Sequence, residues 1–147
     1  MLIGRAQIEA LIPHAGTMCL LDSVESWDEE TILCSTRSHL AASNPLRCGE
    51  MLAAIHGAEY GAQAMAVHGG LLAQRDGEKP VAGYLAALRD VRWEVDDLAQ
   101  VAGTLQVSAR QLMRGGGNMM YEFAVSCDGR LLVSGRATVM SGEGAMQ

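Results

Sequence analysis

Three polar side chains, His56, Glu59 and Gln63, lie one helical turn apart in the otherwise apolar stretch HGAEYGAQAMAVHGG (56–70). Spacings of three and four residues place them on one face of a helix. Because apolar and small residues surround Glu59 for several turns, we expect burial, although most mid-helix glutamates face solvent. A buried carboxyl group tends to stay protonated and can act as a general acid. The stretch therefore predicts a catalytic acid at Glu59. Gln63 either hydrogen-bonds Glu59 or satisfies a buried backbone group.

A general base for the same reaction has two candidates among the four histidines. His39 follows a predicted strand in TRSHLAASNPLR (36–47), and we rank it first. His56 could approach Glu59 from the preceding turn, or it could be a core histidine that bonds a carbonyl. A base must lie within reach of the proton that it removes, so geometry decides between them. His68 precedes Gly69-Gly70, and we expect it to meet the last carbonyl groups of the helix.

Other polar residues could line the mouth of such a site. The candidate substrate-binding residues are Gln63, Asn44 and Arg47, of which the last two belong to the NPLR segment that precedes the helix. Arg47, Arg89 and Arg92 could together bind a phosphate group or an acidic protein, because guanidinium groups form paired hydrogen bonds with both kinds of anion. The alternative for each arginine is an ordinary solvated position on the surface.

Composition limits the class of protein. The chain has 147 residues, 49% of them hydrophobic, which is enough for one domain with a substantial core. A net charge of −6 without any basic run excludes an ordinary nucleic-acid binder. The longest uncharged run, residues 60–74, is too short and too polar for membrane insertion. Four cysteines without paired spacing, and no signal peptide, favour a cytoplasmic protein with reduced thiols and no metal site.

The pattern along the chain predicts a short helix, two strands, a long helix and four strands. The long helix is apolar nearly all round, and Gly57 and Gly61 within it require close packing to offset their low helix propensity. In the last strands, odd-numbered apolar residues alternate with polar ones, as expected for antiparallel strands with one buried face. Asp128-Gly129 predicts a tight hairpin, while Gly69-Gly70 could end the helix. The expected helices are 6–12 and 51–72, and the expected strands are 18–24, 31–37, 81–95, 101–109, 119–127 and 131–139. We therefore predict one α+β domain over residues 1–147, an antiparallel sheet wrapped around a long central helix.

Three segments in this order resemble the hotdog-fold 3-hydroxyacyl-[acyl carrier protein] dehydratases of fatty-acid synthesis. They are IPHAGTMCLLDSV (12–24), the Glu-x-x-x-Gln pattern of EYGAQ (59–63), and AGYLAALRDVRWEV (82–95). Within that family the chain is most similar to the divergent branch associated with aryl polyene biosynthesis, on the NPLR and EYGAQAMAVHG segments. The resemblance covers nearly the whole chain and implies a hotdog fold.

The resemblance also implies an activity: dehydration of a 3-hydroxyacyl thioester to a trans-2-enoyl thioester, without cofactor. It places the acid at Glu59, at a dimer interface where a partner supplies the base. Its partners would be an acyl carrier protein and a second subunit, in a homodimer, a higher oligomer, or a hetero-oligomer with a second dehydratase. His14 corresponds to a structural histidine of the family's opening phrase.

The chain departs from the family pattern in two places. Pro45 occupies the position of the usual catalytic histidine, and Ala53-Ala54 replace the Pro-Gly pair that opens the helix. These departures favour an alternative, a weakly active or non-catalytic partner subunit of a dehydratase. A hotdog acyl thioesterase, which directs its helix carboxylate at water, is a further alternative, because fold alone does not choose among these activities.

Overall fold

The computed structural model describes residues 2–12, 18–78, 83–115 and 117–141. The strands are β1 (Ile3–Gly4), β2 (Ser23–Trp27), β3 (Thr31–Thr36), β4 (Gly83–Trp93), β5 (Leu105–Gly115), β6 (Asn118–Cys127) and β7 (Arg130–Ser141). The α-helices are α1 (Arg5–Leu11) and α2 (Gly57–Arg75), and three short 3-10 helices are η2 (Ser38–Leu40), η3 (Ala54–His56) and η4 (Leu98–Gln100). Lys79, Pro80 and the Pro13-His14 pair lie outside the described residues.

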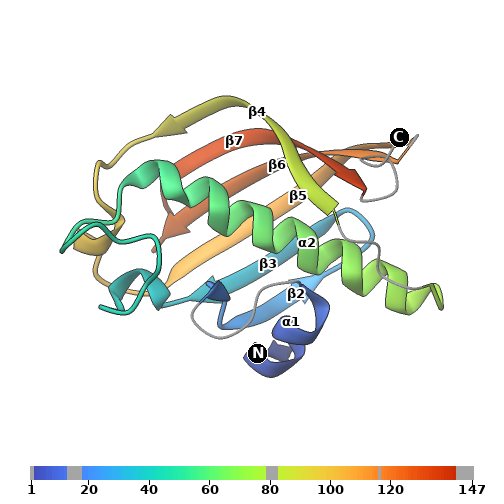
Figure 1. The fold of residues 1–147 in the computed structure, drawn as a ribbon, viewed down its shortest axis with the longest axis horizontal. Helices are drawn as coiled ribbons and strands as arrows, with labels where there is room; N and C mark the ends of the chain where they lie inside the picture. Colours follow the sequence, from blue (N-terminus) through green and yellow to red (C-terminus); the bar gives the residue numbers. More distant parts are fainter. Residues whose placement is uncertain (1, 13–17, 79–82, 116, 142–147) are drawn as a thin grey trace.

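All strands form one antiparallel sheet in the order β1-β2-β3-β5-β6-β7-β4. The sheet curves around α2, which crosses its inner face (Figure 1). The predicted α+β architecture, a sheet wrapped around a long helix, is therefore confirmed. One edge of the sheet is β4, which follows α2 in the sequence but pairs with the last strand, β7. The outward edge of β4 has no partner strand within the described part of the chain.

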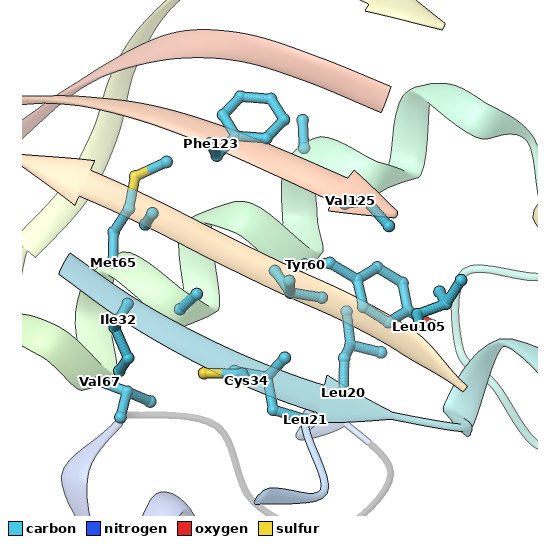
Figure 2. Close-up of a cluster of buried hydrophobic side chains, with 14 of the residues drawn as sticks. Leu20, Leu21, Ile32, Cys34, Tyr60, Met65, Val67, Leu105, Phe123 and Val125 are labelled. Atoms are coloured by element: carbon cyan, nitrogen blue, oxygen red, sulfur yellow. The ribbon is translucent and has the colours of Figure 1, made fainter. Parts of the chain in front are cut away.

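The core lies between α2 and the inner face of the sheet. Tyr60 and Met65 of the helix meet Phe123 and Val125 of β6 there (Figure 2). The predicted alternation of β5 and β6 is confirmed, since their odd-numbered residues from 105 to 109 and from 121 to 127 are buried. The Asp128-Gly129 hairpin is also confirmed, with φ angles of +50° and +79° that match a type I′ turn.

Two glycines let α2 approach the sheet closely. A Cβ atom on Gly57 would lie 2.9 Å from Val133 Cγ2, and one on Gly61 would lie 2.7 Å from two ring atoms of Phe123. No larger residue fits at these distances without a shift of the core. The close packing predicted from the glycines is thus present, and it offsets their unfavourable helix propensity.

Several predicted boundaries were wrong. Residues 18–22 are largely buried but form no strand, and β2 begins at Ser23. Helix α2 begins at Gly57, after η3, and continues past Gly69-Gly70 to Arg75. Neither of those two glycines adopts a positive φ, so they do not act as a helix stop. Leu131, which was expected to face the core, is 45% exposed.

None of the helices in the described ranges has the length and apolar character needed to cross a membrane.

Candidate active site

The segment that leads into α2 is held by the segment that follows β4. The Asp97 carboxylate accepts hydrogen bonds from the backbone N–H groups of Leu52 (2.9 Å) and Ala99 (2.9 Å). Leu98 N–H in turn donates to the Leu52 carbonyl (2.8 Å), and both leucine side chains are fully buried. These bonds, the one from Leu52 first, lower the pKa of Asp97 below its ordinary value. The start of α2 is therefore fixed by a structured loop.

Glu59 lies in the first turn of α2 with its side chain exposed. The expected burial was wrong, because one stripe of the helix, including Ile55 just before it and Ala66, faces away from the sheet. This stripe consists largely of small and apolar residues, so hydropathy does not distinguish it from the buried faces. Glu59 makes no hydrogen bond or ion pair with any other described residue. Within the described ranges, the Glu59 side chain is therefore exposed and without a partner on a helix face of small and apolar residues.

His56 is the candidate base on the same stretch of chain. It ends η3, three residues before Glu59, and it is half-buried. No hydrogen bond joins it to Glu59, since it forms no side-chain bond within the described ranges. A polar ring that is partly open to solvent and lies one turn from the carboxylate is available to a substrate bound there.

His39 has a different environment, because its side chain is fully buried in η2. Its Nε2 atom lies 3.0 Å from the Val101 carbonyl oxygen, so Nε2 carries the proton and donates it. Burial lowers the pKa of the ring, and the remaining nitrogen, Nδ1, has no hydrogen-bond partner among the described residues. The structure therefore encloses a neutral histidine between loops, and it does not bring His39 and Glu59 into direct contact.

Asn44 is the centre of a buried hydrogen-bond network. Its Nδ2 atom donates to the Ser38 carbonyl (2.9 Å) and to the hydroxyl of Tyr60 (3.0 Å), while Oδ1 accepts from Leu46 N–H (2.9 Å). The Tyr60 hydroxyl also lies 2.9 Å from Ser38 Oγ. This network ties the loop after β3 to α2. Sequence reasoning missed Tyr60, whose position directly after Glu59 was the available signal.

Gln63 satisfies the backbone rather than Glu59. Its Oε1 atom accepts from Leu20 N–H and its Nε2 atom donates to the Met18 carbonyl, both at 2.8 Å. Of the two alternatives left open by the sequence, the structure thus shows the backbone role. Arg47 donates weakly to the Glu50 carbonyl (3.4 Å), and its buried Nε atom has no partner within the described part of the chain.

His68 lies within α2 and does not meet the last helix carbonyls, so that expectation was wrong. Its Nε2 atom lies 2.8 Å from the Asp28 carbonyl and must donate to it, which leaves Nδ1 to accept from the hydroxyl of Tyr121, also at 2.8 Å. Gln111 Nε2 donates to the same hydroxyl (3.2 Å). The chain of bonds is complete, and burial lowers the pKa of His68. His68 is therefore a structural histidine.

In the described ranges, no three His, Cys, Asp or Glu side chains are arranged to hold a metal ion.

Comparison with known proteins identifies the family of the chain. The chain matches the family described as ApeP-like, ApeP dehydratase, over residues 6–147, and it belongs to that family. Comparison with curated proteins gave no match.

Solved structures show the same hotdog fold. The dehydratase heterocomplex ApeI:P from Xenorhabdus doucetiae contains a chain that is 24% identical, with a TM-score of 0.84 and 95% of each chain covered. A mutant thioesterase from Pseudomonas aeruginosa is 16% identical, with a TM-score of 0.58, and covers 92% of this chain and 91% of its own. The E. coli PaaI protein from the phenylacetic acid degradation operon is 12% identical, with a TM-score of 0.57 and coverages of 80% and 81%.

Proposed function

We propose that this chain is a subunit of a dehydratase that converts a carrier-protein-bound 3-hydroxyacyl thioester to the trans-2-enoyl thioester. The observation that carries the proposal is the unpaired carboxylate of Glu59 on an exposed helix face, in a chain of the ApeP-like dehydratase family. If a second subunit encloses this face and the carboxyl group is protonated there, it can deliver that proton to a substrate lying along the face. The carrier would be an acyl carrier protein of fatty-acid or polyene-type biosynthesis.

The proposed reaction breaks the C2–H and C3–O bonds and forms the C2=C3 double bond. A base removes the C2 proton, whose acidity is raised by the neighbouring thioester carbonyl. A backbone N–H at the start of the helix stabilises the negative charge that develops on the carbonyl oxygen. Glu59 protonates the departing hydroxyl group, which leaves as water. His56 is the base candidate that shares the open side of the helix, while His39 would act only if its enclosing loops opened.

A second subunit would complete this site. Three apolar side chains flank the unpaired edge of the sheet, Ile55 of η3 with Leu88 and Trp93 of β4, and they are 44%, 39% and 49% exposed. These side chains come from two elements that contact each other, η3 and β4. Burying them in a subunit interface is favourable, and a partner there would also enclose Glu59. The ApeI:P structure is a heterocomplex, which supports a hetero-oligomer over a homodimer or a larger homo-oligomer for this chain as well.

Two other functions use the same geometry. A thioesterase would direct Glu59 at water, and we test this activity because the Pseudomonas aeruginosa thioesterase has the same fold. A non-catalytic subunit would use the face only for assembly, which the replacement of the family's histidine by Pro45 favours. Neither alternative gives Glu59 the role of protonating a hydroxyl group.

The product formed from a 3-hydroxyacyl carrier protein distinguishes the dehydratase, the thioesterase and the non-catalytic subunit. The assembly is purified from its own source cells through a tag on this chain and incubated with a 3-hydroxyacyl carrier protein. Intact mass spectrometry then follows the acyl group. We expect loss of one water with the acyl group still on the carrier. Release of the free hydroxy acid would identify a thioesterase, and an unchanged substrate would overturn the proposal.

A further inference from the structure

An irregularity in β4 changes which residues share a face of the sheet. Arg89 pairs with Arg136 of β7, and Arg92 pairs with Ser134, so three steps along β4 match two steps along β7. Within this bulge, Asp90 adopts a φ of +54°. In a regular strand, residues three apart point to opposite faces. The bulge therefore brings Arg89 and Arg92 to the same face.

That face is the outer one, away from α2. On β7, Gly135 and Ala137 are buried on the helix side, so Arg136 between them points outward. On β4, Val91 is on the helix side, because a Cβ atom on Gly135 would lie 3.1 Å from Val91 Cγ2. Arg89, Arg92 and Arg136 are all exposed. These three arginines therefore belong to the outer face of β4 and β7, two strands that lie side by side at the edge of the sheet (Figure 1).

Among the described residues, no carboxylate forms an ion pair with Arg89, Arg92 or Arg136. Glu122 pairs with Arg136 across β6 and β7, but its carboxylate bonds Arg110 on the other side, at 3.1 Å. Asp90 in the bulge forms no ion pair either. Arg89 and Arg136 are directly opposite each other, and like charges in that position destabilise a sheet. In a chain with a net charge of −6, three arginines thus share one face without an ion-pair partner in the described part of the sequence.

We infer that Arg89, Arg92 and Arg136 form a docking site for an acidic protein surface, namely the carboxylate-bearing face of the carrier protein that delivers the substrate. The inference rests on the proposed function. Charge complementarity supports it, because the rest of this acidic chain would repel such a partner and only a local cationic patch attracts it. In addition, β4, which carries Arg89 and Arg92, contacts η3, the short helix that leads into α2. The proposed site differs from the expected set of Arg47, Arg89 and Arg92. It contains Arg136 in place of Arg47, which lies in the loop before η3.

The test measures binding apart from turnover. The probe is a purified acidic acyl carrier protein whose acyl group is attached through a stable amide, and its affinity for the native assembly is measured by fluorescence anisotropy at two salt concentrations. We expect Arg136→Glu to weaken binding by about tenfold or more and to reduce its salt dependence. Arg136→Lys, which keeps the charge, should retain most of the affinity. The matched control is Arg114→Glu, which changes the net charge equally and affects an exposed arginine at the end of β5, a strand that pairs with neither β4 nor β7.

Turnover of two substrates separates this inference from the proposed function. In Arg136→Glu, KM should rise for the carrier-bound substrate but not for a 3-hydroxyacyl pantetheine thioester, which lacks the protein. The docking site would be overturned if wild type and Arg136→Glu bound the carrier equally, or if Arg136→Glu and Arg114→Glu lost affinity equally. A wild-type assembly that dehydrates the pantetheine thioester without binding the carrier would also overturn it. Charge-dependent carrier binding without any dehydration would instead reject only the proposed function.

Discussion

Replacing Gly61 by alanine tests the helix-to-sheet packing that positions the candidate site. The new methyl group would lie 2.7 Å from both Cδ2 and Cγ of Phe123. On its far side the ring packs against Gly135, where an added Cβ atom would lie 3.0 Å from Cε1 and Cζ. Phe123 is 1% exposed. The overlap must therefore displace either the helix or β6.

The size of the effect follows from a matched control, Gly69→Ala, in the same helix. A Cβ atom on Gly69 would have no neighbour within 4 Å, so that substitution changes only the helix propensity, which favours alanine by about 1 kcal/mol. Gly61→Ala gains the same term but adds overpacking of about 1–3 kcal/mol. We therefore expect the free energies of unfolding of the two variants to differ by about 1–3 kcal/mol, with Gly69→Ala the more stable.

Urea unfolding at one fixed protein concentration measures this difference, since an oligomer's stability depends on concentration. A second variant, Phe123→Leu, removes part of the ring and should make Gly61→Ala less harmful than it is in the wild-type background. Equal stability of Gly61→Ala and Gly69→Ala would refute the close approach of α2 to β6.

Two further predictions concern the groups that hold the site in place. Asp97→Ala removes the acceptor of two backbone hydrogen bonds and should lower the free energy of unfolding by about 1–2 kcal/mol. Asp97→Asn keeps one acceptor oxygen and should lower it less. Urea unfolding compares the two variants, and equal effects would contradict the hydrogen-bonding role. Because burial lowers the pKa of His68, the unfolded chain binds a proton first as the pH falls below about 6.5, and stability must decrease there. His68→Gln should be less stable at pH 8 but should lose less stability between pH 8 and pH 5; an unchanged pH dependence would contradict this assignment.

The fold was predictable because its signals are local or periodic. Alternation marked β5 and β6, the Asp-Gly dipeptide marked their hairpin to β7, and the glycines of α2 indicated close packing. The start of β2 was not predictable from periodicity, since residues 19–21 are apolar and buried but belong to no strand. Buried irregular backbone resembles a strand in its composition.

The candidate site was predictable in residue identity but not in environment. Glu59 is exposed although its neighbours are small and apolar, because exposure depends on which side of the helix the sheet covers. Gln63 and Asn44 looked like substrate ligands, and only their distances to backbone atoms and to Tyr60 show their structural contacts. The bulge at Asp90, which places Arg89 and Arg92 on one face, leaves no signal in the sequence pattern.

The most direct test of the dehydratase proposal is the rate of water loss from a 3-hydroxyacyl carrier protein in an assembly where only this chain carries Glu59→Gln. The glutamine keeps the size of the side chain but cannot donate an acidic proton. The control is Glu30→Gln, an exposed carboxylate in the turn between β2 and β3. We predict that Glu59→Gln slows dehydration by roughly 100-fold or more while the assembly stays intact and Glu30→Gln has no effect. An intact Glu59→Gln assembly that works at the wild-type rate would contradict the proposal that this chain supplies the acid.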